Sequence, residues 1–174
     1  MFELFLRQLT TMKIHYLCLS YDDLSKDHLY ALLALRQEVF VVEQHCPYLD
    51  ADGNDQQAYH LLGLTENGAL ATYSRLLPVG SSYQDYAAIG RVITAPFARG
   101  QKLGRTLMTT AIERVKAIWG DVPIKLSAQA HLRGYYGSVG FKPVGEIYLE
   151  DGIPHVGMVY GGGGIIDTAE KYSN

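Results

Sequence analysis

The stretch TAPFARGQKLGRTLM, residues 94–108, decides how the fold of this chain is interpreted. It follows the apolar run AAIGRVI (87–93), which has the composition of a strand. After it, apolar residues recur on one face of a predicted helix that reaches Trp119. Backbone N–H groups at such a strand-to-helix junction are able to bind a phosphate. The same glycines also suit a plain tight turn, and these residues alone leave both interpretations open.

Signatures of several other site types are absent from the sequence. The stretch contains neither G-x-G-x-x-G nor G-x-x-x-x-G-K-[ST], so neither a Rossmann dinucleotide site nor a nucleotide P-loop is predicted. The six histidines form no H-x-x-x-H or H-E-x-x-H pair, and Cys18 and Cys46 lack metal-type spacing. We therefore predict no metal site and no disulfide framework.

Length and composition indicate one globular domain. The chain has 174 residues, of which 48% are hydrophobic and 19% are charged, with a formal net charge of -3. That charge argues against broad nucleic-acid binding, which usually needs a basic face. No run approaches the roughly 20 apolar residues of a membrane helix, and the scarcity of cysteine favours a reducing compartment. We predict a cytoplasmic protein that binds neither nucleic acid nor membrane.

Residues 13–160 are predicted to form this single domain. Residues 1–12 are expected to be a flexible N-terminal extension, and residues 161–174, which begin GGGG, a flexible glycine-rich tail. Asn67-Gly68 and Asp151-Gly152 mark hairpin turns. Strands are expected at 13–20, 59–65, 69–77, 87–93, 123–130, 141–149 and 155–159, with helices at 26–42, 100–119 and 131–139. This order predicts an α/β (α+β) domain with a mixed central sheet flanked by helices.

A second stretch, HLRGYYGSVGFKPVG (131–145), carries Tyr-x-x-x-Gly-Phe after a predicted strand. With the pattern V-x-x-x-P-x-x-R-G-x-x-x-G from Val92 to Gly104, it resembles the GNAT superfamily of acyl-CoA-dependent N-acetyltransferases, and within it the ElaA group. The likeness rests on residues 35–53, 89–104, 127–141 and 150–158. One position departs from the family signature [RQ]-x-x-G-x-[GA], because Lys102 stands where its first glycine would be.

The resemblance implies a GNAT fold in which acetyl-CoA lies where two parallel strands, here 87–94 and 123–130, splay apart. The backbone of Val92, Ile93 and Thr94 would pair with the pantetheine arm. The pyrophosphate would be held chiefly by backbone amides of one loop, made of Arg99, Gly100, Gln101, Lys102, Leu103, Gly104 and Arg105.

The resemblance also implies direct attack by an amine on the thioester. The amide of Ile93 or a neighbour would stabilise the oxyanion, and Tyr136 would protonate the leaving thiolate as general acid. Alternatively, Tyr136 only hydrogen-bonds the sulfur. The strand before the loop offers no carboxylate, so the base stays unidentified among Glu43, His60, Glu146, His155 and a water chain.

The segment LRQEVFVVEQ carries Arg36, Glu38, Glu43 and Gln44, which by the same resemblance face the acceptor side or else form a solvated helix end. The acidic run at 50–55 lacks the spacing of a calcium loop. It is expected to be a turn-rich loop, able to meet a cationic amine.

The expected function is transfer of acetyl from acetyl-CoA to a primary amine in a ternary complex. Lysine side chains, polyamines, aminoglycosides and free amino acids all remain open as acceptors. Two alternatives keep the fold: a CoA-binding regulatory module without turnover, and an acyltransferase for longer acyl donors like the acyl-homoserine lactone synthases. Members of the family are often dimers, so a homodimer is an expected state that no stretch decides.

Overall fold

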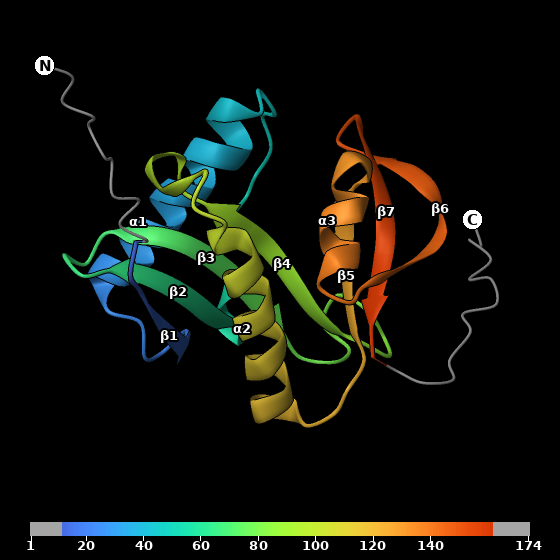
Figure 1. Ribbon diagram of the computed structural model, residues 1–174, viewed down its shortest axis with the longest axis horizontal. Helices are drawn as coiled ribbons and strands as arrows, with labels where there is room; N and C mark the ends of the chain where they lie inside the picture. The colour runs from blue at the N-terminus through green and yellow to red at the C-terminus, as the bar shows by residue number, and fades with distance from the viewer. Residues whose placement is uncertain (1–11, 162–174) are drawn as a thin grey trace, which may run out of the picture.

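A seven-stranded mixed sheet forms the centre of the protein, in the order β1-β2-β3-β4-β5-β7-β6 (Figure 1). The computed structural model describes residues 12–161, so the expected extension and tail lie almost wholly outside the described residues. The strands are β1 (Ile14–Ser20), β2 (Tyr59–Thr65), β3 (Leu70–Leu77), β4 (Ala87–Thr94), β5 (Ile124–Gln129), β6 (Lys142–Glu150) and β7 (Ile153–Tyr160). Neighbours are antiparallel except β4 and β5, which are parallel.

The helices follow the predicted order, with one difference. They are α1 (Lys26–Arg36), α2 (Leu103–Trp119) and α3 (Arg133–Ser138), with short 3₁₀ turns η2 (Asp55–Gln57), η3 (Pro96–Ala98) and η4 (Ala130–Leu132). Ser25 caps α1 by accepting a hydrogen bond from the His28 amide at 3.1 Å. The single α-helix expected over 26–42 is wrong beyond Arg36, where the chain continues as a π-helix, η1 (Gln37–Glu43). Its Val-Phe-Val-Val run is rich in β-branched residues that disfavour a regular α-helix.

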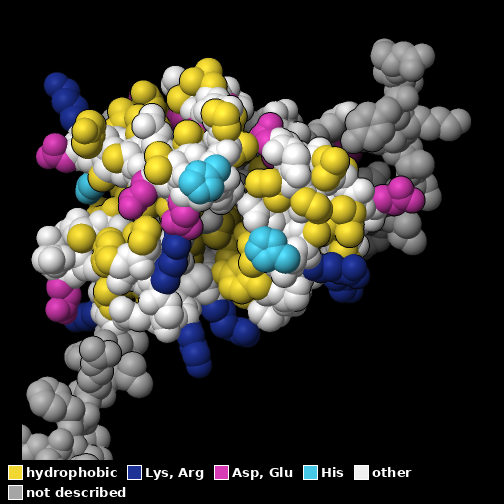
Figure 2. Space-filling view, turned by 90° about the horizontal axis from the view of Figure 1, so that it is seen from above, with side chains coloured by type: hydrophobic (Ala, Val, Ile, Leu, Met, Phe, Trp, Pro, Cys, Tyr) yellow, Lys and Arg dark blue, Asp and Glu magenta, His cyan; other side chains and the backbone are white. Residues whose placement is uncertain are grey.

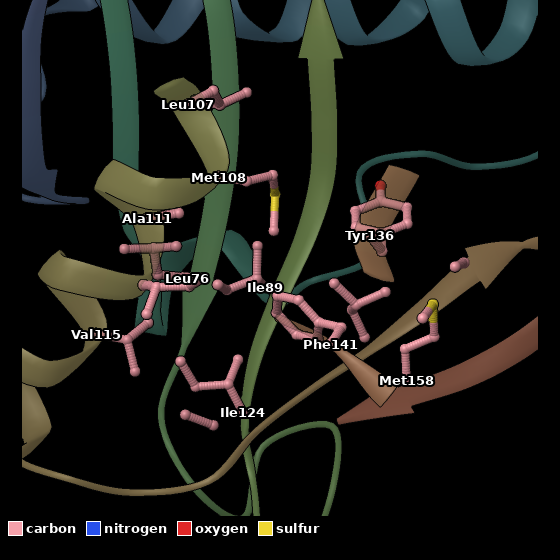
Figure 3. Close-up of a cluster of buried hydrophobic side chains, with 14 of the residues drawn as sticks. Leu76, Ile89, Leu107, Met108, Ala111, Val115, Ile124, Tyr136, Phe141 and Met158 are labelled. Atoms are coloured by element: carbon pink, nitrogen blue, oxygen red, sulfur yellow. The ribbon is translucent and has the colours of Figure 1, made fainter. Parts of the chain in front are cut away.

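Helices cover both faces of the sheet, and successive residues of the strands supply the two cores (Figure 1). On β2, Leu61 packs in the core beneath α2, whereas Leu62 packs in the core beneath α1. Figure 3 shows the α2 side, where apolar residues of that helix meet residues from the strands. They are Leu107, Met108, Ala111 and Val115 of α2 with Leu76, Ile89, Ile124, Phe141 and Met158.

A β-bulge in β4 changes which core that strand contacts. Arg75 of β3 pairs with Gly90 and Tyr73 pairs with Ile93, so β4 carries one extra residue between these pairs. Arg91 lies in the bulge with a positive φ of 52°. Ile89 and Ile93 would face the same side of a regular strand, but Ile93 packs in the α1 core while Ile89 packs in the α2 core.

The parallel strands β4 and β5 are joined only at one end. Their pairs are Ala87 with Ile124 and Ala88 with Lys125. β5 continues along β7, pairing as far as Gln129 with His155, while β4 continues along β3 to Thr94. The two strands therefore diverge toward their carboxyl ends, as the sequence resemblance implied.

Three arginines and three aspartates hold the bulge in place by forming a closed ring of ion pairs, called here the arginine–aspartate ring. Each aspartate contacts two arginines, and all three aspartates come from the loop at 50–55. The ring runs Arg36–Asp50–Arg91–Asp52–Arg75–Asp55 and returns to Arg36, with nitrogen–oxygen distances of 2.6, 2.7, 3.5, 2.7, 3.0 and 2.7 Å in that order.

This ring ties α1, β3 and β4 to one loop. Arg36 is fully buried at the end of α1. The guanidinium carbon of Arg91 also lies 5.9 Å from the centroid of the Phe40 aromatic ring and 5.8 Å from the centroid of the Tyr48 aromatic ring. The ring is neutral in sum, which is how buried charges avoid a large desolvation penalty.

We expect Leu107→Ala to lower the free energy of unfolding by about 2–5 kcal/mol, because it opens a cavity in the α2 core. Leu107 has no exposed surface, whereas Leu149 on β6 is 72% exposed. Leu149→Ala is therefore the matched control and should change stability by less than about 0.5 kcal/mol. Urea unfolding measures both, and equal effects would contradict this assignment of the core.

We expect stability to fall as the pH drops below about 4, because of two aspartates of the ring. Burial would raise the pKa of Asp55, but hydrogen bonds from Arg36 and Arg75 more than offset it and hold the pKa below its usual value. The pKa of Asp52 is lowered in the same way by Arg75. The folded protein thus keeps these carboxylates charged where the unfolded chain binds protons. Their stabilisation is present above pH 4 and is lost as the pH falls.

Asp55→Asn should cost about 3–5 kcal/mol at pH 7, because it leaves Arg36 and Arg75 without a shared counter-ion. It should also reduce the dependence of stability on pH below 4. Asp121→Asn removes a carboxylate that is 92% exposed and should do neither. Unfolding by urea between pH 3 and pH 7 tests this, and identical pH profiles for Asp55→Asn and the parent would refute it.

Candidate active site

A cleft of about 900 Å³ lies where β4 and β5 diverge. Residues 89–94 of β4 form one wall, and Leu126, Ser127 and Gln129 of β5 form another. Residues of η1 and the hairpin between β6 and β7 complete the lining, among them Glu43, Gln44, Glu150 and Asp151. Figure 2 looks onto the end of the molecule at which β4 and β5 separate, and shows acidic, basic and histidine side chains beside a hollow.

The β4 wall offers backbone groups as well as side chains. Within residues 12–161, β4 has no strand partner on its β5 side beyond Ala88. Val92, Ile93 and Thr94 all line the cleft along this free edge. Ile93 as a whole residue is only 2% exposed, and its side chain packs in the α1 core, so a ligand contact at Ile93 would have to use its backbone. An extended ligand could add to this edge as a further strand does.

The loop after β4 ends at the start of α2. Arg99 lines the cleft, whereas residues 100–105, which form the turn and the first residues of α2, are not among its lining residues. The first amides of α2 have no intrahelical partner, and no side chain caps this helix start. The side chain of Leu103 is buried against Ala71 and Ala98, which leaves its backbone for any ligand. A Cβ on Gly104 would lie 2.8 Å from the Tyr135 hydroxyl, so a larger residue there would displace the Tyr135 side chain.

Lys102 shows why the general signature has glycine at its position. It adopts φ 59° and ψ 19°, a left-handed conformation, directly before α2. Glycine reaches this region freely, whereas another residue does so at about 1–2 kcal/mol. The turn keeps this conformation with lysine, whose side chain is exposed. The helix predicted from residue 100 therefore begins at Leu103, because Gly100 and Lys102 both have positive φ.

Tyr136 lies on α3 between the core and the cleft. It is 7% exposed, and its ring packs edge-on against Tyr135 and Phe141 with centroid distances of 4.9 and 6.2 Å. Figure 3 shows its hydroxyl pointing away from the apolar side chains around it. Burial raises the pKa of Tyr136 above its ordinary value of 10, with a smaller contribution from Tyr135. The phenol is therefore protonated at neutral pH and lines the cleft as a hydrogen-bond donor.

The four candidate bases lie in different places. Glu43 and His155 line the cleft, whereas His60 and Glu146 are not among the residues that do. His60 is fully buried, and its Nε2 donates to the Asp55 carbonyl oxygen at 3.0 Å while its Nδ1 accepts from the Tyr73 hydroxyl at 2.8 Å. Burial lowers its pKa, so His60 is a neutral structural residue beside the arginine–aspartate ring.

His155 belongs to a polar cluster that the sequence did not indicate. Its Nδ1 donates to the Ile153 carbonyl oxygen at 2.8 Å, which leaves Nε2 with a free lone pair. Its ring stacks on Tyr148, whose hydroxyl is 2.6 Å from the Ser127 hydroxyl, and Ser127 donates to Glu150 at 2.7 Å. The alternation of Lys125, Ser127 and Gln129 with buried residues on β5 was the signal for one wall of this cluster.

Of the polar residues predicted to face the acceptor, some line the cleft and others do not. Glu43 and Gln44 line the cleft, but Arg36 is buried in the arginine–aspartate ring, and Glu38 lies in a separate groove beside Phe97. The acidic loop at 50–55 also differs from the predicted loop, which would be able to meet a cationic amine. Its three aspartates are bound to arginines, and Asp52 alone among them lines the cleft, so the loop is no free acidic surface.

Between Met12 and Gly161, no three His, Cys, Asp or Glu side chains are grouped as metal ligands would be. No helix in this range has the length and apolar character needed to cross a lipid bilayer.

Comparison with known proteins gives the family. Residues 21–161 match the acetyltransferase (GNAT) domain. Protein ElaA of Escherichia coli K12 is 48% identical over 142 residues, which are 80% of this chain and 92% of ElaA. The crystal structure of Escherichia coli ElaA superposes with a TM-score of 0.78 at 45% identity, covering 84% of this chain and 99% of that one.

An acyl-CoA N-acyltransferase from Pseudomonas aeruginosa superposes with a TM-score of 0.81 at 47% identity, covering 85% of this chain and 99% of that one. The similarity thus covers most of the chain, and it confirms the GNAT fold and the likeness to ElaA that the sequence motifs predicted. The chain belongs to the GNAT acetyltransferase family, whose members are acyl-CoA-dependent N-acyltransferases.

Proposed function

We propose that the protein transfers an acetyl group from acetyl-CoA to a primary amine by direct attack in a ternary complex. The observation that carries this proposal is the cleft itself. It brings together the free edge of β4 at residues 92–94, the Arg99 side chain and the protonated phenol of Tyr136. The strand edge would bind the pantetheine arm, the guanidinium of Arg99 would bind phosphate, and the phenol of Tyr136 would protonate the thiolate.

The cleft fits acetyl-CoA as a co-substrate. The pantetheine arm contains amides, which would hydrogen-bond the backbone of Val92 and Thr94 as a strand would. The diphosphate would bind the uncapped amides at residues 100–105 and the guanidinium of Arg99, because the start of α2 carries partial positive charge. Apart from the Arg99 guanidinium, these interactions use backbone atoms, which explains why a lysine side chain at position 102 is compatible with the role.

The acyl group moves in one displacement. The neutral amine nitrogen attacks the thioester carbon, and the carbonyl oxygen becomes an oxyanion that the Ile93 amide would stabilise. The carbon–sulfur bond then breaks, and Tyr136 would donate its proton to the leaving thiolate. The proton that the amine loses passes to a base, and Glu43 and His155 are the predicted candidates that line the cleft.

Two alternatives from the sequence keep the same fold. A regulatory module would bind CoA and show no turnover with any amine. An enzyme for longer acyl chains would prefer octanoyl-CoA to acetyl-CoA. A panel of a lysine-containing peptide, spermidine, kanamycin and free amino acids, each tested with both donors, separates these from the proposed activity. The cytoplasmic location and the homodimer stay predictions.

Acetyl-CoA at about 100 times its dissociation constant should stabilise the protein by roughly 2.7 kcal/mol. The double variant Arg99→Glu, Gly104→Asp should lose this effect, because it adds negative charge to the proposed phosphate site. Thermal unfolding and calorimetry with and without acetyl-CoA measure it, with Glu38→Gln outside the cleft as the control. If the double variant binds acetyl-CoA as well as the parent does, the loop is not the phosphate site. If the parent does not bind acetyl-CoA, the proposed function is wrong.

Tyr136→Phe should reduce kcat by about 10²-fold or more, because the thiolate would leave without a proton donor. The ring and its packing are kept, so the dissociation constant for acetyl-CoA should change little. Tyr30→Phe, on a tyrosine that is 79% exposed on α1, is the control. Steady-state kinetics with the best amine of the panel measure kcat for both variants and the parent. An unchanged kcat for Tyr136→Phe would show that Tyr136 is not the acid.

A further inference from the structure

The end of η1 contacts both arms of the splayed strands. Glu43 accepts a hydrogen bond from Arg99 Nη2 at 2.9 Å, and Arg99 follows β4. Gln44 accepts one from the side-chain amide of Gln129 at 3.4 Å, and Gln129 is the last residue of β5. Residues 43 and 44 therefore bridge the residues that follow or end the two diverging strands.

The contact between Glu43 and Arg99 is weak enough to be exchanged. The two side chains are 44% and 46% exposed, and ion pairs this exposed contribute about 0–1 kcal/mol. The second hydrogen bond of Arg99, from Nε to the Thr94 carbonyl oxygen, is 3.3 Å long. A diphosphate offers several charged oxygens and is able to bind a guanidinium through two parallel hydrogen bonds. It would compete with Glu43 for the same cation.

The neighbouring charges show what happens to Glu43 after such an exchange. Arg91 is the other arginine that lines the cleft, and it is bound to Asp50 and Asp52. Asp52 is bound in turn by Arg75 through two hydrogen bonds of 2.7 Å. The charged groups of Arg91 and Asp52 are therefore already paired within the arginine–aspartate ring. Without Arg99, the carboxylate of Glu43 would face the cleft with no arginine in contact.

We propose that the diphosphate of acyl-CoA displaces Glu43 from its ion pair with Arg99. The freed carboxylate of Glu43 then binds the ammonium group of the acceptor. The diphosphate and the carboxylate compete for one guanidinium, so the acceptor site is completed only when the donor is bound. This inference rests on the proposed function, because Arg99 must contact the diphosphate of CoA. It adds to that function an order of binding and a residue that recognises the acceptor.

Coenzyme A binding measured by calorimetry tests the exchange. Glu43→Gln should lower the dissociation constant about two- to five-fold, because Arg99 no longer has to leave an ion pair. Glu38→Gln removes the same charge from the same helical segment but away from the cleft, and it should have no such effect. Pantetheine lacks the diphosphate, so its affinity should be equal for the parent and for Glu43→Gln.

A double-mutant cycle separates the exchange from general charge effects. Arg99→Gln should weaken coenzyme A binding, and adding Glu43→Gln to it should bring no further change, because Glu43 acts on the ligand through Arg99. A gain in affinity from Glu43→Gln that persists without Arg99 would refute the exchange. If the parent binds coenzyme A and Glu43→Gln binds it equally well, the exchange is wrong while the proposed function stands.

Kinetics test the role of Glu43 toward the acceptor. With the best amine of the panel, Glu43→Gln should raise the KM for the amine about tenfold or more without raising the dissociation constant of acetyl-CoA. An unchanged KM would exclude Glu43 as the acceptor contact. If the parent acetylates no amine of the panel, the proposed function fails, and the acceptor role of Glu43 fails with it.

Discussion

The arginine–aspartate ring is the constraint on which the cleft depends. Arg91 lies in a β-bulge with φ 52°, a conformation that residues with a Cβ adopt at a cost. The ring holds it there through Asp50 and Asp52 and links it to α1 and β3. The bulge increases the local twist of β4 along the part of the strand that no longer pairs with β5, since their last pair is Ala88 with Lys125. An arrangement of buried ions thus fixes the geometry of a site whose proposed chemistry uses other residues.

Short-range signals allowed much of the fold to be predicted. Asn67-Gly68 and Asp151-Gly152 marked the two hairpins, and the periodicity of α2 marked its buried face, because each depends on residues close together in the chain. The likeness of two separated motifs then gave the family and, with it, the splayed strands. The apolar spacing over 26–42 does not by itself distinguish the π-helix η1 from a continuation of α1, because it suits either.

Long-range pairing explains what the sequence could not show. Asp50, Asp52 and Asp55 read as a free acidic loop because their partners, Arg36, Arg75 and Arg91, lie on three separate elements. His60 was a candidate base by residue type alone, and its burial follows from its place on β2 between β1 and β3, beside Tyr73 and Asp55. The cluster of Ser127, Tyr148 and His155 likewise forms only when β5, β6 and β7 pair in register.

The sparse pairing of β4 with β5 has a mechanical consequence. The sheet is continuous in connectivity, yet only two residue pairs cross its middle. Bending about that line would break few backbone hydrogen bonds, whereas bending elsewhere would break a full ladder. The stiffness of the joint therefore comes mainly from the apolar core on the α2 side, which contains residues of both strands, Ile89 of β4 and Leu126 of β5 among them. Non-directional contacts of this kind tolerate small rotations, so the two walls can adjust to the thickness of a ligand while each keeps its own shape.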